Sequence, residues 1–259
     1  MSGTLRGNLP TSYTVIFMIG MILVSPLAAV AGEWRVTPIR LFFDKGSRSG
    51  ILNVQNDGEK PMNLQVKAME WTQDAEGKDQ YAETTDLVFF PKFLMVPGKE
   101  ERVVRIGNKG VPGAKERTYR VFIEEVTPPP KDDQGQGASV FVNVRFAVPL
   151  FAGPAKEEVS AKLQAELKKG AVTAVIENTG NLHFRLTALE ARGKNAKGEE
   201  TFRQKVDGWY LLNGAKRSYT FRIPKDGCLA SDSIELEGKA DRTVTIKAGL
   251  AVDKAQCLP

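Results

Sequence analysis

Histidine and cysteine are scarce in this chain, and their scarcity excludes several kinds of chemistry. The 259 residues include one histidine and two cysteines. A structural zinc site takes about four ligands, so the usual sites built from cysteine and histidine cannot form. Triad catalysis would have to use His183, and the chain has no nucleophile-elbow or paired-carboxylate motif. We therefore expect no metal, no cofactor and no enzymatic activity, and a hydrolase that depends on His183 is the weakest function considered.

An excess of charge of one sign is also lacking. The chain has 36 basic and 31 acidic residues, a net charge of +5, and the two signs are mixed along the sequence. A nucleic-acid-binding protein usually concentrates basic residues in a stripe or cluster. We therefore expect no nucleic acid as partner, and, because no catalytic motif is present, no small-molecule substrate.

Long apolar runs are limited to one block near the N-terminus. Val15–Val24 is apolar, and Ala29-Val30-Ala31 forms a small-residue cleavage site before Gly32. This order is typical of a secretory signal peptide, and the block is short for a span of about 20 residues. The sequence predicts a signal peptide over residues 1–31, with an uncleaved N-terminal anchor as the alternative.

Export changes the interpretation of the two cysteines, Cys228 and Cys257. In an oxidising compartment an isolated pair of cysteines most simply forms a disulfide. Closing a loop of this length would stabilise the folded protein by about 3–4 kcal/mol. A redox-active pair is less favoured because the C-x-x-C spacing is absent.

Two segments of the chain resemble each other. Residues 54–58 (VQNDG) and 176–180 (IENTG) each end one apolar run and precede another, over 62–70 and 182–190. Apolar and polar residues alternate in the second runs, which is the period of a strand with one buried face. Each copy predicts strand, Asn-x-Gly turn, strand, and their equivalent places favour two tandem domains of one type.

The remaining pattern predicts an all-β protein with two immunoglobulin-like β-sandwich domains. Seven strands are expected in the first half, at about 33–43, 49–56, 61–72, 87–96, 101–107, 117–126 and 139–151. In the second half strands are expected at 171–178, 182–192, 200–212, 217–224 and 243–252, whereas residues 159–167 fit a strand or a helix. Gly153 and Pro154 break the chain, so the domains are expected at 32–152 and 153–259.

The segment from Ser139 to Phe151 differs from an ordinary core strand. Large apolar side chains occupy one face in the order Val140, Val142, Val144, Phe146 and Val148. Core packing is the simpler explanation, but such a row at a sheet edge could also be offered to another chain. A proline-rich, glycine-rich loop over 127–138 precedes it, which suits a strand that becomes ordered when a partner binds.

The chain resembles a known family, the PapD-like periplasmic chaperones of the chaperone–usher pilus pathway. The resemblance covers residues 33–259 and is best in the first half. It is carried by Val36–Arg40, the Asn56 turn, Leu87–Pro91, Pro97-Gly98-Lys99 before Val104-Arg105-Ile106, Arg117–Val126, and Val148-Pro149-Leu150-Phe151. The last of these suggests the archaic branch of the family.

The resemblance implies two domains that meet at an angle in an L shape, with a cleft between them. It implies that the protein binds, folds and caps pilus subunits by donor-strand complementation, a form of β-augmentation, and delivers them to an outer-membrane usher. The donor residues would be Val140, Val142, Val144 and Phe146. Arg40 would bind the C-terminal carboxylate of the subunit, because a guanidinium can bind a carboxylate with two parallel hydrogen bonds.

The sequence departs from the family at two basic positions. The lysine expected near the end of the donor strand falls on Pro149, and Arg145, Lys156 or no residue at all would replace it. Gly153 stands where the family has a basic residue of an interdomain ion network. Glu124 and Glu125 are interpreted either as members of an interdomain ion pair or as solvated charges.

Other conspicuous side chains are given structural interpretations. Trp71, Trp209 and Tyr119 are expected in the core or at a sandwich edge, and His183 is expected to be exposed on the polar face of its strand. The main alternative to a pilus chaperone is a secreted two-domain binding or adhesive module, in which the strand at 139–151 is plain core.

Overall fold

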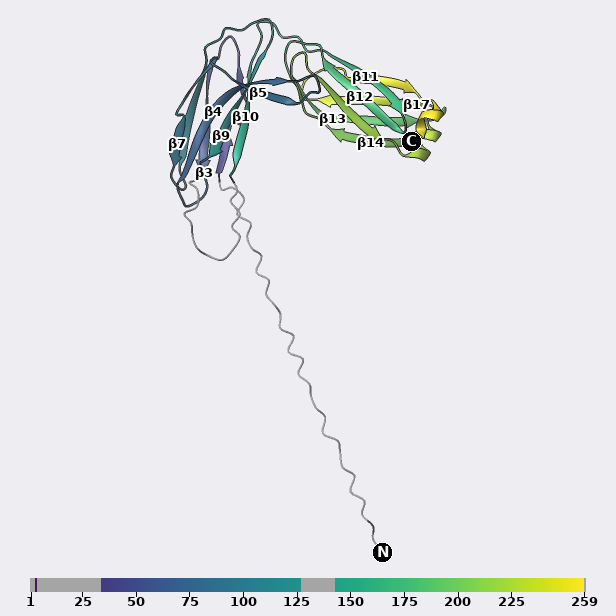
Figure 1. Ribbon diagram of the computed structural model, residues 1–259, viewed down its shortest axis with the longest axis horizontal. Coiled ribbons are helices and arrows are strands. Elements are labelled where there is room, and N and C mark those ends of the chain that lie inside the picture. Colours follow the sequence, from purple (N-terminus) through teal and green to yellow (C-terminus); the bar gives the residue numbers. More distant parts are fainter. Residues whose placement is uncertain (1–2, 4–33, 127–142, 259) are drawn as a thin grey trace. The chain divides into compact units, whose positions relative to one another are not determined.

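The computed structural model describes residue 3, residues 34–126 and residues 143–258 (Figure 1). Nearly all regular structure in these residues is β-sheet, arranged as four sheets in two sandwiches. The prediction of an all-β chain with two sandwich domains is confirmed. No helix in this part of the chain is both long enough and apolar enough to cross a bilayer.

The first sandwich is built from ten strands between Trp34 and Ala152. One sheet has the order β1-β3-β8-β6: β1 (Trp34–Thr37), β3 (Ser49–Asn56), β8 (Glu101–Asn108) and β6 (Leu87–Phe90). The other has the order β2-β10-β9-β4-β5, with β7 also on β4: β2 (Leu41–Phe43), β10 (Arg145–Ala152), β9 (Arg117–Glu125), β4 (Met62–Gln73), β5 (Asp79–Glu83) and β7 (Phe93–Val96).

Two of the strands expected in the first half are each divided between the two sheets. The run at 33–43 becomes β1 in one sheet and β2 in the other, separated by Pro38, whose preceding peptide bond is cis. The run at 87–96 becomes β6 and β7 on either side of Pro91, also preceded by a cis bond. Proline lacks the N–H needed for a central ladder, so the chain changes sheets at these points.

The second sandwich has a small sheet and a larger one. The small sheet has the order β11-β12-β16: β11 (Ala161–Lys168), β12 (Ala171–Asn178) and β16 (Lys216–Arg222). The larger has the order β14-β13-β17-β18, with β15 also on β13: β14 (Glu200–Asp207), β13 (Phe184–Lys194), β17 (Ser233–Ala240), β18 (Lys247–Ala251) and β15 (Tyr210–Leu211). The segment at 159–167 is therefore a strand, while β17 was missed from the sequence.

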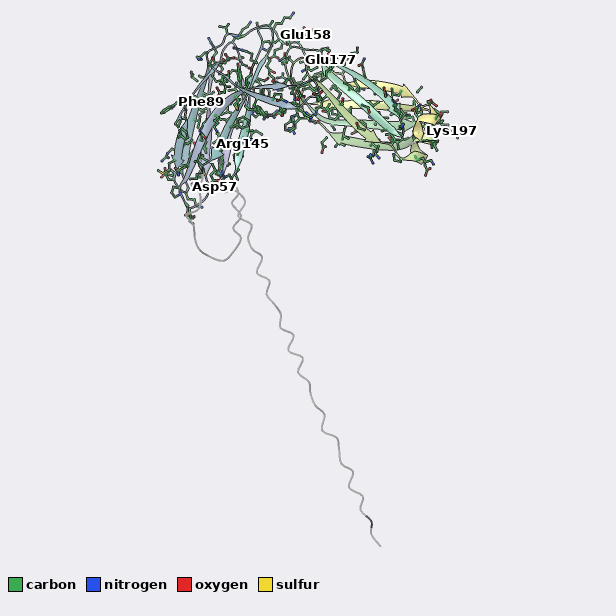
Figure 2. All side chains as sticks on the ribbon, in the orientation of Figure 1. Asp57, Phe89, Arg145, Glu158, Glu177 and Lys197 are labelled. Carbon is green, nitrogen blue, oxygen red and sulfur yellow. A yellow bond between two sulfur atoms is a disulfide. The ribbon has the colours of Figure 1, made fainter. Side chains whose placement is uncertain are left out.

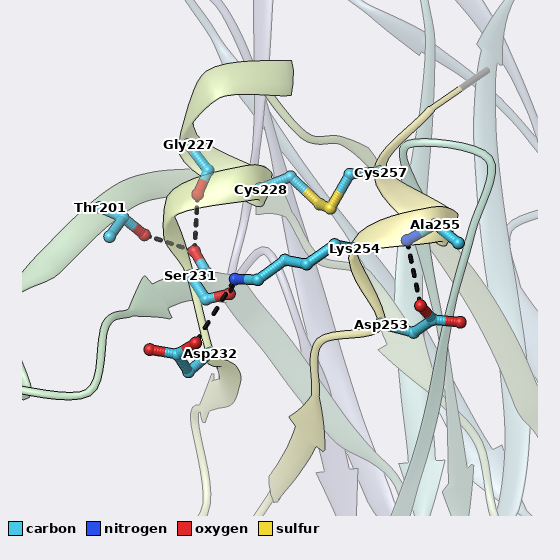
Figure 3. The surroundings of a disulfide bond; sticks show 9 residues. All are labelled: Thr201, Gly227, Cys228, Ser231, Asp232, Asp253, Lys254, Ala255 and Cys257. Carbon is cyan, nitrogen blue, oxygen red and sulfur yellow. Dashed lines mark hydrogen bonds and ion pairs between the residues drawn. A yellow bond between two sulfur atoms is a disulfide. The ribbon is translucent and has the colours of Figure 1, made fainter.

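A disulfide closes the end of the second sandwich (Figure 3). Cys228 lies on the short helix α1 (Lys225–Ala230) and is bonded to Cys257 on the 3-10 helix η1 (Lys254–Cys257). Both cysteines are buried in the core of this sandwich. Lys254 also forms an ion pair with Asp232 at 3.5 Å, so η1 is held at two points.

Asn56 and Asn178, the asparagines of the two repeated segments, form equivalent hydrogen bonds in the two sandwiches. The Asn56 amide donates to Lys60 O and Val96 O, and its Oδ1 accepts from the N–H of Gly58. The Asn178 amide donates to Leu182 O and Leu211 O, and its Oδ1 accepts from the N–H of Gly180. Both side chains are almost fully buried, so each satisfies backbone groups that water cannot reach.

The turns at these asparagines differ from simple hairpins, because the strands they join do not pair with each other. β3 and β4 lie in opposite sheets of the first sandwich, as do β12 and β13 in the second. Each strand buries one face against the other layer, so the connection must cross the sandwich at its end. The equivalent geometry of the two turns supports the interpretation of residues 54–70 and 176–190 as an internal repeat.

Candidate functional site

Among the described residues, one side of β10 has no partner strand over its first five residues. Against β9 the strand is paired along its whole length, from Arg145 to Ala152. On its other side β2 covers only Leu150–Ala152, in a parallel pairing. In the described parts of the chain no strand covers that side of residues 145–149. Figure 2 labels Arg145 at the start of this stretch.

The hydrogen bonds show which backbone groups face the open side. The N–H of Glu125 donates to Val144 O at 3.1 Å, so even-numbered residues of β10 bond toward β9. In an antiparallel pair the direction alternates, and odd-numbered residues therefore point away from β9. The N–H of Gly153, at the end of the strand, correspondingly donates to Phe43 O beside β2. Unpaired N–H and C=O groups on such an edge are a template for an added strand.

Apolar side chains at the open end of β10 face the core of the first sandwich. Val144 and Phe146 are partly buried and pack against this core, and Val148 is buried within it. The ring of Phe146 meets Trp34 edge-on, with centroids 4.6 Å apart. Val140 and Val142, the other expected donor residues, lie outside the described residues. The binding role of these four side chains stays a prediction.

Arg40, the expected carboxylate anchor, directly precedes β2. Leu41 pairs with Leu150, so Arg40 stands at the level of Pro149 beside the open stretch of β10. Its side chain lies opposite to buried Leu41, on the face directed at the second sandwich. There its Nη1 is 3.4 Å from Asp241 Oδ2. Because the side chains are 36% and 26% exposed, this pair contributes less than about 1 kcal/mol and can be exchanged.

Pro149 occupies a position of β10 at which a proline removes no hydrogen bond between strands. Its nitrogen faces the open side, so no ladder bond to β9 is lost. Of the cations considered as replacements for the missing lysine, Arg145 lies 3.9 Å from Glu124 and over the ring of Phe122 at 4.7 Å. Lys156 is exposed beyond the end of β10. Neither is directed at Pro149 by a contact seen here.

His183 is buried, so the expectation of an exposed residue is wrong. The side chain is 1% exposed, and its Nδ1 lies 2.8 Å from Glu116 Oε2. The same oxygen accepts a hydrogen bond of 2.8 Å from the His183 N–H. The ring stacks on Phe151 with centroids 3.5 Å apart. His183 precedes β13, and alternation within a strand therefore does not decide which way it points.

The Glu116–His183 pair joins the two sandwiches, which was one of the roles considered for Glu124 and Glu125. Glu124 instead pairs with Lys67 at 2.6 Å, on the neighbouring strand of its own sheet. Glu116 makes further links through its backbone: its N–H donates to Asn181 O, and its carbonyl accepts from the Asn213 amide. These bonds fix the loop before β9 to two loops of the second sandwich.

Aromatic side chains fill the contact between the sandwiches. Trp71 and Phe151 of the first sandwich form a buried cluster with Tyr210, Leu212 and Ala215 of the second. Trp71 and Tyr119 are fully buried and Trp209 is 37% exposed, consistent with core and edge positions. A pocket of about 600 Å³ is lined by residues of both sandwiches, among them Glu116 and Asn213.

Three charged residues at this contact were not singled out from the sequence: Glu116, Asp241 and Arg120. Arg120 lies on β9, where Tyr119 and Val121 face the core of the first sandwich. Alternation along the strand therefore indicates only that Arg120 lies on the opposite face. Asp241 accepts a hydrogen bond from the Arg185 N–H as well as pairing with Arg40. No local motif marks these residues, because their partners are far away in the sequence.

Comparisons with known proteins agree with this architecture. Residues 34–158 match the family described as "Pili and flagellar-assembly chaperone, PapD N-terminal domain". The chain is 24% identical over 188 residues to chaperone protein FanE of Escherichia coli, covering 70% of this chain and 76% of FanE.

Solved structures share the whole fold at low sequence identity. One is a chain of the CsuC–CsuE chaperone–tip adhesion subunit complex of archaic chaperone–usher Csu pili from Acinetobacter baumannii, with a TM-score of 0.56, 18% identity, and coverage of 84% of this chain and 96% of that one. Another is from the complex of SafA pilin with the SafB chaperone of Salmonella enterica, with a TM-score of 0.52, 14% identity, and coverage of 85% and 97%.

The family match lies over the first sandwich, and the two-sandwich fold extends the likeness through the second. Together they confirm the resemblance seen in the sequence. Residues 34–158 thus form a PapD-like N-terminal domain of the pilus chaperones, and the chain as a whole has the two-sandwich fold of solved pilus chaperones.

Proposed function

We propose that this protein captures pilus subunits by adding a strand of the subunit to the open side of β10. The observation that carries the proposal is the uncovered stretch Arg145–Pro149, whose backbone groups face outward while Val144 and Phe146 face a sandwich core. A subunit that lacks one strand exposes an apolar groove and two sheet edges. A strand that offers both backbone partners and apolar side chains covers these surfaces.

The donor residues are Val140, Val142, Val144 and Phe146. Burying one valine side chain is worth about 1.5–3 kcal/mol, so three or four anchors and a hydrogen-bond ladder suffice for stable capture without nucleotide hydrolysis. Phe146 is already partly covered by Trp34 in the free chain, so it contributes less new burial than Val144.

The direction of the added strand follows from the position of Arg40. A chain that runs parallel to β10 along its open side is collinear with β2 and ends next to Arg40, which precedes β2. An antiparallel chain would place its amino end there. The cation favours a carboxylate, so we infer that the C-terminal carboxylate of the subunit binds Arg40 in exchange for Asp241.

We also infer how the protein is exported and where its two domains begin and end. Residues 1–31 act as a cleaved signal peptide that exports the protein to the periplasm, residues 32–152 form the domain with the donor strand, and residues 153–259 form the second domain. The loaded chaperone then delivers its subunit to an outer-membrane usher. Support comes from the apolar block and cleavage site at the N-terminus and from the match of residues 34–158 to the family.

The test uses a subunit that copurifies with the tagged protein from the periplasm of its native host. Val144→Asp places a charge in the donor row and should lower the recovery of a one-to-one complex at least tenfold. Val88→Asp is the matched control, because Val88 is 52% exposed on an edge strand of the other sheet. Its complex should form normally.

Circular dichroism of the free variants separates the proposal from its alternative. If Val144→Asp stays folded and still recovers the subunit normally, strand donation is wrong. If the substitution unfolds the protein itself, the strand is plain core, as expected of a secreted binding or adhesive module.

A further inference from the structure

In the described part of the chain, β6 is an edge strand whose outer side has no partner strand. It is the last strand of the β1-β3-β8-β6 sheet and pairs with β8 alone. The N–H of Lys109 on β8 donates to Asp86 O at 2.8 Å, so even-numbered residues of β6 bond toward β8. The backbone groups of Leu87 and Phe89, the latter labelled in Figure 2, therefore point outward.

This edge lacks most of the features that protect the edge strands of natural proteins. Such edges are commonly blunted by charged side chains, by proline or by a very short strand. β6 has the sequence LVFF, and Pro91 limits its length but leaves its outward N–H and C=O groups free. The side chains of Val88 and Phe90 are 52% and 74% exposed. An exposed apolar edge of this kind is a template for an added strand.

The apolar face continues from β6 across the two neighbouring strands. Val88 pairs with Gly107 on β8, and Phe90 pairs with Arg105, which in turn pairs with Ile51 on β3. Because Gly107 has no side chain, the face is hollowed beside Val88, and a groove of about 530 Å³ is lined by these residues. Continuous exposed apolar surface is typical of an interaction site.

Arg105 places a positive charge in the middle of this apolar face. Its neighbours on the same side of β8 are Val103 and Gly107, and its neighbours across the strands are Ile51 and Phe90. No carboxylate of the described residues lies within 4.0 Å of the Arg105 guanidinium. A carboxylate brought by a partner would therefore find an unpaired arginine surrounded by apolar surface.

A second copy of this chain does not match that cation. If two β6 strands paired antiparallel through their outward backbone groups, Phe90 of one copy would stand opposite Asp86 of the other. The Asp86 carboxylate already accepts hydrogen bonds from Arg117 and Tyr119, at 3.0 and 2.7 Å. A strand of a different protein that has a free carboxylate at this level matches both the open edge and Arg105.

We propose that β6 binds an extended acidic segment of a partner protein, which adds as an antiparallel strand and pairs a carboxylate with Arg105. The residue opposite Phe90 carries the carboxylate, and the residue two places later is apolar and covers Val88. Adjacent strands lie about 4.8 Å apart, so the two long side chains span a backbone separation of about 10 Å over Phe90. β6 and β10 belong to different sheets, so this site does not depend on subunit capture.

The probe is a capped, fluorescein-labelled peptide of sequence Ser-Thr-Val-Glu-Val-Leu-Thr-Ser, titrated with the full chain and followed by anisotropy. A second peptide has glutamine in place of glutamate. A third has proline in place of the valine after the glutamate, which removes the N–H that would bond to Phe89 O. Arg105→Met removes the cation, and Val88→Asp places a charge in the apolar row. Arg35→Met is the matched control, because Arg35 is on the same face of this sheet and is paired with Asp57.

We expect wild type and Arg35→Met to bind the glutamate peptide equally, and about two- to fivefold more tightly than the glutamine peptide, as for an exposed ion pair. Arg105→Met should bind these two peptides alike, with the affinity that wild type has for the glutamine peptide. The proline peptide should bind wild type at least tenfold more weakly, and Val88→Asp should bind every peptide at least tenfold more weakly. Circular dichroism checks the fold of each variant, and Arg105→Met alone decides if Val88→Asp does not fold.

Failure of the wild type to bind the glutamate peptide would overturn the proposal. An unchanged preference for glutamate in folded Arg105→Met would overturn the pairing with Arg105, and equal binding of the proline peptide would overturn strand addition. If sedimentation shows a wild-type dimer that Val88→Asp dissociates and that the peptide does not disrupt, the occupant is a second copy and the proposal is wrong. Subunit recovery by Val144→Asp tests the proposed function separately, since that substitution leaves β6 unchanged.

Discussion

Replacing His183 by alanine should destabilise the protein strongly, because the His183 ring is a hydrogen-bond partner of the buried Glu116 side chain. Both side chains are almost inaccessible, 1% and 2% exposed, and the ring contact is 2.8 Å. In His183→Ala the backbone N–H still donates to Glu116 Oε2, but the ring bond to the carboxylate is lost. A hydrogen bond to a charged group contributes about 1.5–3 kcal/mol.

The stacking of the ring on Phe151 adds a second contribution. Such aromatic pairs are worth about 0.5–1.5 kcal/mol beyond burial, so the total expected loss is about 2–4.5 kcal/mol. With a urea dependence of about 2–3 kcal/mol per molar, the midpoint should fall by about 0.7–2 M. His183→Phe keeps the stack and removes the hydrogen bond, and should account for more than half of the loss.

The assay is urea unfolding followed by tryptophan fluorescence and by far-ultraviolet circular dichroism. Trp71 lies in the aromatic cluster between the sandwiches, so fluorescence should report separation of the two halves before the sheets unfold. Lys197→Ala, at an exposed position in the turn after β13, is the control. A midpoint for His183→Ala within about 0.2 M of wild type, or a His183→Phe variant as stable as wild type, would refute the reasoning.

Two further predictions concern other buried polar groups. Asn178→Ala and Asn56→Ala should each cost about 2–4 kcal/mol in chemical denaturation, because each leaves two carbonyls and one N–H of a turn unsatisfied; a loss below about 0.5 kcal/mol in either variant would contradict the equivalence of the turns. Burial and the hydrogen bond to Asp86 raise the pKa of the Tyr119 hydroxyl above its ordinary value of about 10. The unfolded chain then releases this proton at lower pH than the folded chain, so the stabilisation is complete below about pH 10 and is lost as the pH rises above it. Urea midpoints at pH 8 and pH 11 should differ less for Tyr119→Phe than for wild type. Part of the difference should remain, because the pKa values of Tyr81 and Tyr219 are also raised. An unchanged pH dependence in Tyr119→Phe would contradict this contribution of Tyr119.

Local sequence was a good guide wherever a strand has one buried face. Residues 171–178 were expected as a strand and form β12, in which every second side chain is buried. The pattern failed where tertiary contacts cover both sides of a segment. His183 looked like a polar strand residue, yet Phe151 and Glu116 from the first sandwich enclose it.

The candidate site shows the same division. The row through Val144 and Phe146 follows from alternation alone, because a period of two places these residues on one face of a strand. Arg120 could not be found in this way. Its surroundings depend on its register with Pro149 and on the Trp71 ring beneath it, which are contacts between distant parts of the chain.

By itself, the sequence determined that this protein is a two-sandwich β protein with a short apolar block near its N-terminus, an alternating apolar row over residues 140–148 and too few histidines and cysteines for the usual metal sites. Composition and periodicity act over a few residues, and these features depend on nothing more. Only the tertiary structure decided that, within the described residues, β2 covers no more than the end of β10, that Glu116 and His183 join the sandwiches, and that Arg40 and Arg120 stand level with Pro149. Those outcomes depend on strand order and register, which are set by burial and hydrogen bonding between segments far apart in the chain.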